Sequence, residues 1–393
     1  MQSFNMGQVP AATFGSGRIS KVPRIADGLS SGPVLIVADA ALAELGVTDA
    51  LTGPLADAGR PFDLAAVVAG EPKIALVNEL CERARSVGAT LIIGLGGGAA
   101  MDAAKLVAAI TPSGQPAEDF ELAAQPLPKT QLPSIAIPTT AGTGSEVTRT
   151  SVISQPDGSK IWFWGEELMF SQAVLDPEVT LSLPPHLTAW TGIDAVAHAL
   201  EGATSRNTSP AGQLYGLEAL RLLADALPKA VADGSDIDAR AKVLWASMVA
   251  GLALHNCNTH MGHNISHALG SLVRVHHGLA TGLALEASLP WLVARPEGAD
   301  NYARAAQALG GAPSADALPD ALAALMRACG IEKALPAECA AVTAEALAQE
   351  MKAPANVGMA QNSACPVGDP EIDQMAGLMM AMPVMAAREL ASG

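Results

Sequence analysis

A short apolar run that ends in three consecutive glycines is the feature that most constrains this fold. Residues 91–95 are strand-like, and Gly96, Gly97 and Gly98 lead directly into residues 99–105, a strongly helix-forming segment. Glycines let backbone N–H groups approach a pyrophosphate, and the helix N-terminus adds partial positive charge. The segment favours a dinucleotide-binding site, although a tight turn without a ligand would use the same glycines.

The remaining N-terminal sequence repeats the alternation of strand and helix. Because apolar runs are separated by amphipathic segments such as residues 73–87, we expect parallel strands with crossover helices. A last strand-like piece precedes Pro177 and the Pro184-Pro185 pair, which cannot continue a central strand. We therefore predict a doubly wound, mostly parallel α/β domain over residues 1–183. Its other expected strands are residues 34–38, 62–68, 134–137 and 172–176.

Beyond this boundary the apolar spacing is helical, for example over residues 214–227, 239–254 and 315–327. An all-helical bundle is expected over residues 184–393. Two domains agree with the length of 393 residues, and 50% apolar but only 3% aromatic residues suit helices packed closely on a parallel sheet.

Charge and hydropathy exclude several classes of partner. The net charge of -16 opposes binding to nucleic acid or to anionic membrane surfaces. The longest apolar stretch, residues 375–387, contains Pro383 and is too short to span a bilayer, so it predicts a buried helix. No secretory leader is visible, and the five widely spaced cysteines predict reduced thiols, so a cytoplasmic protein is expected.

The histidines predict a metal site. All eight lie between His186 and His277, within the expected helical domain. Asp194 and His198 are four residues apart in an apolar helical segment, so they share one face, and an ionised Asp there needs a partner or a cation. His263 and His267 have the same spacing. A carboxylate with several imidazoles suits Fe(II) or Zn, although each histidine alone is more often an ordinary polar residue.

Two further segments favour a cofactor. Asp39 ends the strand at residues 34–38, where its carboxylate could bind a ribose 2′-hydroxyl and repel a 2′-phosphate, favouring NAD over NADP. An Asp at a strand end is also a common turn residue. Residues 138–148 place hydroxyls and two glycines at the carboxyl end of another strand, where open α/β sheets bind ligands.

Taken together, these motifs resemble the iron-containing, or type III, alcohol dehydrogenases over nearly the whole chain. The matching segments are GGGAAMDAAK, PTTAGTGSEVT, DPEVTLSLPP, TGIDAVAHALEG, and HNISHALG followed by VHHGLA. The resemblance implies an N-terminal dinucleotide domain, a helical C-terminal domain, a cleft between them and a homodimer.

The resemblance also implies a role for each matching residue. The metal ligands would be Asp194, His198, His263 and His277, with His276 a neighbour and His267 a catalytic, non-ligand histidine that moves a proton. The implied cofactor contacts are Asp39, Gly96, Gly97, Gly98, Asp102, Thr139, Thr140, Thr148, Lys160 and Leu181, and the implied substrate pocket holds Thr150, Leu254, His267 and Cys365.

The sequence departs from the family pattern at three places. Ala99 stands where Ser is common, which removes one phosphate hydrogen bond. Glu71 replaces the Asn of an Asn-Pro pair, which puts one adenosine-side contact in doubt. Cys365-Pro366-Val367 replaces Asn-Pro-Arg, which affects substrate choice. Arg149 is not expected to bind an anionic substrate, because strand alternation turns it away from Thr148 and Thr150.

The function that the sequence predicts is metal-dependent, NAD-linked oxidation of a small primary alcohol, diol or hydroxy acid, or the reverse reduction of an aldehyde. One alternative is a carbon–oxygen lyase resembling dehydroquinate synthase, which needs cations for a phosphorylated substrate; near the metal segments only Arg274 is present. A non-catalytic metal-binding relative is a second alternative. A metal-free enzyme resembling maleylacetate reductase is disfavoured because all four ligand positions are filled.

Overall fold

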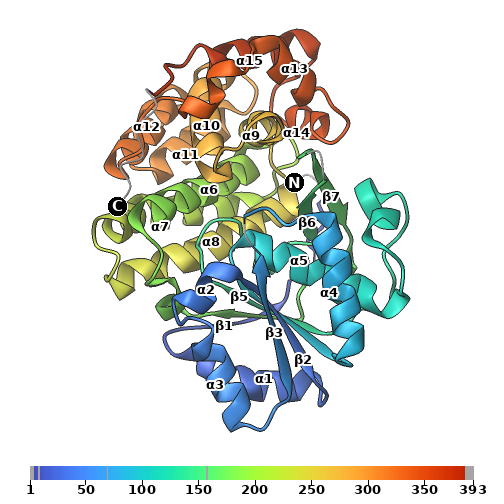
Figure 1. Ribbon diagram of the computed structural model, residues 1–393. Helices are drawn as coiled ribbons and strands as arrows, with labels where there is room; N and C mark the ends of the chain where they lie inside the picture. The colour runs from blue at the N-terminus through green and yellow to red at the C-terminus, as the bar shows by residue number, and fades with distance from the viewer. Residues whose placement is uncertain (1–3, 8, 69, 156–157, 386–393) are drawn as a thin grey trace. The chain divides into compact units, whose positions relative to one another are not determined.

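The computed structural model describes residues 4–7, 9–68, 70–155 and 158–385, and within them the chain forms two compact units (Figure 1). The sheet unit comprises Gly7–Pro184 and Gly234–Gly251. The helical unit comprises Pro185–Asp233 and residues 252–385, together with residues 4–6. Residues 234–251 thus group with the sheet unit although they follow helical-unit residues in the sequence.

The sheet unit is built on six parallel strands, which confirms the predicted fold class. Their spatial order is β1-β8-β5-β4-β2-β3, so the glycine-bearing strand β4 lies between β5 and β2. All five expected strands are present, and β1 is one that the sequence did not reveal. The bounds are β1 Ala11–Phe14, β2 Val34–Asp39, β3 Phe62–Val68, β4 Leu91–Gly96, β5 Ser134–Pro138 and β8 Gln172–Leu175.

Both faces of this sheet are covered by helices because its strands are apolar on both sides. Along β2, Leu35 and Val37 join the core formed with α4 (Ile74–Ser86) and α5 (Gly98–Ile110). The alternate residues of β2 join the second core, with α1 (Val22–Leu29) and α3 (Asp49–Asp57). A short helix, α2 (Ala40–Glu44), follows β2. This arrangement is the doubly wound layering expected from the sequence (Figure 1).

An antiparallel hairpin of β6 (Thr150–Ser154) and β7 (Lys160–Trp164) was not predicted. Phe163 is buried in the core shared with α4 and α5, whereas Trp164 is half-exposed. The Arg149 guanidinium lies over the Trp164 ring, 4.5 Å from its centroid, and pairs with the Glu166 carboxylate. Arg149 therefore has two partners of its own, and the expectation that it does not bind an anionic substrate remains a prediction.

The remainder of the chain is helical, as predicted. The expected helices at 214–227 and 239–254 are present in longer form, and residues 315–327 form a 3₁₀ turn followed by a helix. The bounds are α6 Pro185–Thr204, α7 Pro210–Ala232, α8 Ile237–Cys257, α9 Met261–Leu272, α10 His277–Val293, α11 Ala299–Ala308, α12 Leu318–Ala328, α13 Ala344–Met351, α14 Val357–Gln361 and α15 Asp369–Met380.

The prediction of a helix over residues 375–387 was wrong at its C-terminal end. Helix α15 stops at Met380, before Pro383, because proline restricts the residue that precedes it and removes a backbone donor. The Pro383 carbonyl instead accepts from the Leu335 N–H at 2.8 Å, and residues 386 and 387 lie outside the described residues. Among the helices that the structure describes, none is long and apolar enough to cross a bilayer.

The loop after β5 is held close to α8 by a pair of glycines. Gly144 has a left-handed φ of +61°, and a Cβ at this position would lie 2.6 Å from the Gly251 Cα. Both the backbone conformation and the contact therefore require glycine. The loop carries Thr139, Thr140 and Thr148, so this contact fixes the position of predicted cofactor residues.

Gly144→Ala is expected to lower the free energy of unfolding by roughly 2–5 kcal/mol, the sum of left-handed strain and overpacking. Gly88→Ala is the matched control, because Gly88 has a φ of +63° with open space around its Cβ position. Its loss should be only about 1–2 kcal/mol. Urea denaturation of both variants checks this, and equal losses would show that the contact with Gly251 contributes nothing.

A buried lysine, Lys105, contacts this loop, and a buried glutamate, Glu146, is part of it. The Lys105 ammonium donates to Thr148 Oγ1 at 3.0 Å and to the Thr150 carbonyl at 2.7 Å. Glu146 is 2% exposed, and burial raises its pKa to about 7, although its own backbone and Lys105 act in the opposite direction. In the folded state Glu146 keeps its proton up to about pH 7, whereas in the unfolded chain it loses the proton near the ordinary pKa of 4.5. The contribution of Glu146 to the free energy of unfolding is therefore greatest below pH 4.5 and falls as the pH rises from 4.5 to about 7.

Because that stabilisation is lost as the pH rises towards 7, Glu146→Gln should gain stability relative to the wild type between pH 5 and pH 8. The expected gain is roughly 2–3 kcal/mol, since the amide does not ionise. Thermal or urea unfolding of both proteins at the two pH values checks it. A difference that does not change with pH would mean that Glu146 titrates normally.

Candidate metal centre and cofactor-binding loop

Helix α6 carries two of the predicted metal ligands on one buried face. Asp194 is 2% exposed, and His198, one turn later, is also buried. The intervening residues, Ala195, Val196 and Ala197, are apolar and buried. A carboxylate in such surroundings needs compensating positive charge or hydrogen bonds, because removing it from water carries a large free-energy penalty.

Two further helices bring histidines to Asp194. His263 lies in the first turn of α9, and His277 is the first residue of α10. The Asp194 Oδ1 atom lies 3.7 Å from His263 Nε2 and 3.5 Å from His277 Nε2. Ligand atoms of these three residues lie within 4.8 Å of one another, so they form a group that can hold a metal ion.

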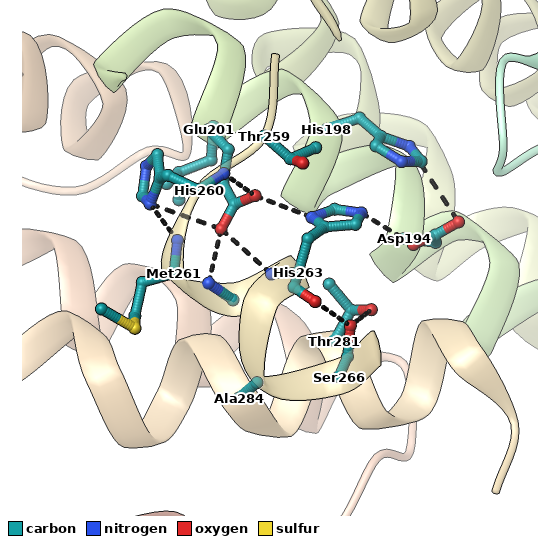
Figure 2. Close-up of polar contacts among 12 residues, drawn as sticks. Asp194, His198, Glu201, Thr259, His260, Met261, His263, Ser266, Thr281 and Ala284 are labelled. Atoms are coloured by element: carbon teal, nitrogen blue, oxygen red, sulfur yellow. Dashed lines mark hydrogen bonds and ion pairs between the residues drawn. The ribbon is translucent and has the colours of Figure 1, made fainter. Parts of the chain in front are cut away.

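His198 lies beside this trio. Its ring stacks on that of His263 with centroids 4.6 Å apart, and its Nδ1 is 4.0 Å from Asp194 Oδ2 (Figure 2). The structure thus brings three of the predicted ligands into one group and places the fourth next to it. The role of His198 as a fourth ligand remains a prediction.

A divalent cation fits the atoms present. Asp194 Oδ1 and His263 Nε2 are both buried, and neither has a hydrogen-bond partner among the residues that the structure describes. Buried polar atoms without partners are rare in native proteins, and a bound ion can satisfy such atoms. One carboxylate oxygen with imidazole nitrogens is also a donor set that Fe(II) and Zn accept.

The charges of the group are strongly coupled. Burial opposes ionisation of Asp194, but the neighbouring His198, His277 and His263 outweigh it and hold its pKa below the ordinary value. Burial likewise disfavours the charged form of His263, yet the carboxylates of Glu201 and Asp194 raise its pKa to about 9. The site thus attracts positive charge, which a bound cation also provides.

Glu201 is a site residue that the sequence interpretation missed. It is fully buried on α6, and its Oε2 accepts from His263 Nδ1 at 2.7 Å and from the His260 N–H at 2.8 Å. Its Oε1 accepts from the Gly262 N–H at 2.6 Å. Asp194, His198 and Glu201 follow an i, i+4, i+7 pattern in an apolar segment, and this spacing could have revealed a third charged residue on the same face.

His260 completes the polar network and caps helix α9. Its Nδ1 accepts from the Met261 N–H at 2.8 Å, so the ring proton lies on Nε2, which contacts Thr204 Oγ1 at 3.0 Å. Burial lowers the pKa of His260, which agrees with a neutral ring. The 3.4 Å approach of this Nδ1 to Glu201 is therefore no ion pair.

The predicted catalytic and substrate residues have different settings. His267 is half-buried, one turn after His263, and its ring centroid is 5.1 Å from that of His277. Leu254 on α8 is half-buried, and Cys365 is buried in the segment that joins α14 to α15. Thr150 lies in the sheet unit at the start of β6. Their part in a substrate pocket remains a prediction.

In the sheet unit, six of the predicted cofactor residues lie at or directly after the carboxyl ends of β2, β4 and β5, namely Asp39, Gly96, Gly97, Gly98, Thr139 and Thr140. Gly97 caps α5, and Gly98 is its first residue. A Cβ on Gly97 would lie 3.3 Å from Thr140 Oγ1, and one on Gly98 would lie 2.7 Å from Thr143 Cγ2. The Thr139 N–H donates to the Gly96 carbonyl at 2.9 Å. The threonine loop thus packs directly on the glycines.

Asp39 is adjacent to the glycines, since a Cβ on Gly96 would lie 3.3 Å from the Asp39 Cβ. The Asp39 carboxylate also caps α2, accepting from the Ala41 N–H at 3.0 Å. It therefore has the turn role that the sequence allowed as an alternative. Its contact with a ribose remains a prediction.

The other predicted cofactor residues have partners of their own. Asp102 accepts from Ser145 Oγ at 2.5 Å and from the Val152 N–H at 2.9 Å. Lys160 pairs with Glu71 at 2.6 Å, so the unusual Glu71 contacts a predicted cofactor residue. Leu181 is exposed after the 3₁₀ turn Pro177–Thr180. Their contacts with a cofactor remain predictions.

Two curated proteins of similar sequence are named as alcohol dehydrogenases. Long-chain-alcohol dehydrogenase 1 of Geobacillus thermodenitrificans (strain NG80-2) is 36% identical over 278 residues, which cover 70% of each chain. The NAD-dependent methanol dehydrogenase of Bacillus methanolicus is 30% identical over 324 residues, covering 81% of this chain and 84% of that one.

Among solved structures, sulfoacetaldehyde reductase from Bifidobacterium kashiwanohense in complex with NAD+ matches with a TM-score of 0.88 at 27% identity, covering 97% of this chain and 100% of that chain. The family model described as iron-containing alcohol dehydrogenase matches residues 10–177, and that of the Fe-containing alcohol dehydrogenase C-terminal family matches residues 188–375. The chain therefore belongs to the iron-containing alcohol dehydrogenase family.

Proposed function

We propose that this protein is a metal-dependent, NAD-linked alcohol dehydrogenase that interconverts a small primary alcohol, diol or hydroxy acid with its aldehyde. The observation that carries this proposal is the buried group of Asp194, His263 and His277, in which Asp194 Oδ1 and His263 Nε2 have no hydrogen-bond partner among the described residues. We include His198 as the fourth ligand, because its ring packs on His263.

The bound cation, the nicotinamide and the side chains of the site would each have a separate role in the reaction. When bound, a divalent cation would supply Lewis acidity toward the alcohol or carbonyl oxygen, and a nicotinamide would exchange the hydride. Asp194 and the imidazoles would hold the cation, and the apolar neighbours of Asp194 would exclude water. His267 is half-buried beside His277, so we assign it the transfer of the hydroxyl proton to solvent.

The cofactor would be NAD rather than NADP. The packed glycines and threonines offer backbone and hydroxyl donors for a pyrophosphate. The Asp39 carboxylate beside them would accept a ribose hydroxyl and repel a 2′-phosphate. The NAD-dependent methanol dehydrogenase and the NAD+ complex of sulfoacetaldehyde reductase support this choice. A homodimer and a cytoplasmic location remain part of the proposal, because the family resemblance and the sequence favour them.

The direct test is NAD reduction by anaerobically purified protein with a panel of short primary alcohols, diols and hydroxy acids, with and without added Fe(II) or Zn. Turnover is expected only with metal. His263→Ala should lose metal and turnover together while remaining folded, because one ligand disappears. His186→Ala is the control, since it removes an imidazole that contacts Trp190 outside the group.

Full turnover by metal-free wild-type protein would refute the metal assignment. Binding of NAD without turnover of any alcohol would instead favour the lyase or the non-catalytic alternative.

Asp39→Gly should relax the preference for NAD by at least roughly tenfold in the ratio of dissociation constants, about 1.4 kcal/mol, because a repulsive carboxylate is removed. Asp39→Asn is the matched variant, because Asn is as good a helix cap as Asp but carries no charge. Titration of both variants with NAD+ and NADP+ measures the ratio. An unchanged ratio in Asp39→Asn would show that the charge does not select the cofactor.

A further inference from the structure

Glu201 has no role in the site as predicted from the sequence, yet it contacts a predicted ligand more closely than any other carboxylate described. Its Oε2 lies 2.7 Å from His263 Nδ1, on the side of the ring opposite the nitrogen that faces Asp194. Figure 2 shows His263 between the two carboxylates, with Glu201 on one side and Asp194 on the other. Each ring nitrogen therefore faces a carboxylate.

The hydrogen bonds around Glu201 exclude it as a ligand. Oε1 accepts from the Gly262 N–H at 2.6 Å and, at 3.4 Å, from the His263 N–H. Oε2 accepts from the His260 N–H and from His263 Nδ1. Both oxygens are therefore directed at donors at the start of α9, and the side chain is fully buried.

These contacts also fix one tautomer of His263. A carboxylate can only accept, so the proton between Glu201 and His263 belongs on Nδ1. In the neutral ring this leaves the lone pair on Nε2, which points toward Asp194 Oδ1, 3.7 Å away. A metal needs that lone pair, and the hydrogen bond at the other nitrogen decides which nitrogen offers it.

Charge balance supports the same arrangement. Asp194 and Glu201 place two buried carboxylates on opposite sides of the His263 ring. A divalent cation would neutralise this pair, whereas a monovalent ion would leave one buried charge without compensation.

We propose that Glu201 is a positioning residue of the metal centre, which holds His263 with its proton on Nδ1 and its Nε2 lone pair turned toward the cation. This inference rests on the proposed metal site. The close approach also explains Gly262, because a Cβ there would lie 2.8 Å from Glu201 Oε1 and 2.7 Å from Leu285 Cδ2. Any larger residue before His263 would displace the carboxylate.

The test is the affinity of the full-length protein for Zn²⁺, measured by competition with a chromophoric chelator. Glu201→Gln should bind Zn²⁺ roughly 10–100-fold more weakly than the wild type, the typical effect of removing a partner of a metal-bound histidine. An amide must turn its NH₂ toward N–H donors, so it cannot replace both oxygens. Asp176→Asn is the matched control.

Asp176 is also a fully buried carboxylate that accepts backbone N–H bonds, from Ile19 and Glu178, but it lies in the sheet unit. Its variant should lose stability while its Zn²⁺ affinity stays within about twofold of the wild type, because the contacts described for Asp176 include no predicted metal-binding residue. Equal Zn²⁺ affinity of Glu201→Gln and the wild type would overturn the positioning role of Glu201 and leave the proposed metal site standing. Failure of the wild type to bind Zn²⁺ would overturn the proposed metal site as well.

A second measurement decides the matter if Glu201→Gln does not fold. Nitrogen NMR of Zn²⁺-loaded wild-type protein with labelled histidines reports which ring nitrogen of His263 carries the proton. We expect a slowly exchanging proton on Nδ1 and coordination through Nε2. A proton on Nε2 of His263 would overturn the inference.

Discussion

The ionised carboxylate of Asp194 is the constraint on which the helical unit depends. It is 2% exposed on a helix whose adjacent residues are apolar, so its charge has to be balanced from other helices. His263 from α9 and His277 from α10 supply that balance through atoms 3.7 and 3.5 Å away. Glu201, further along α6, holds the start of α9 in place. The helices are therefore ordered around the same charge that prepares the site for a cation.

In the sheet unit, close packing of glycine backbone rather than buried charge shapes the predicted cofactor site. The glycines at the end of β4 leave no side chain between the start of α5 and the threonine loop. Gly144 does the same where that loop meets α8. Beneath the loop, Lys105 donates to Thr148 and to the Thr150 carbonyl, so the orientation of these groups does not depend on a bound ligand. Such preorganisation reduces the ordering penalty on binding a cofactor.

Much of the fold could be predicted because its signals are local. The alternating apolar runs predict five of the six parallel strands, and the helical spacing predicts α6 to α9. Strand β1 was missed because it is short and its residues are mostly exposed, so it has little apolar pattern. The β6–β7 hairpin was missed because its two strands are short and pair in a small sheet apart from the six-stranded one. Spacing on one helix predicted that Asp194 and His198 share a face, and in the structure these side chains lie side by side on α6. Glu201 was missed because its role arises from contacts with residues 59 to 62 positions later, whereas its spacing on α6 indicates only the face that it shares with Asp194.

The most direct test is a crystal structure of Zn²⁺- or Fe(II)-loaded protein with anomalous diffraction from the metal. We predict one ion about 2.0–2.2 Å from an Asp194 oxygen, from Nε2 of His263 and His277, and from a ring nitrogen of His198. An ion bound by other residues, or no ion in crystals grown with excess metal, would contradict the proposed metal centre.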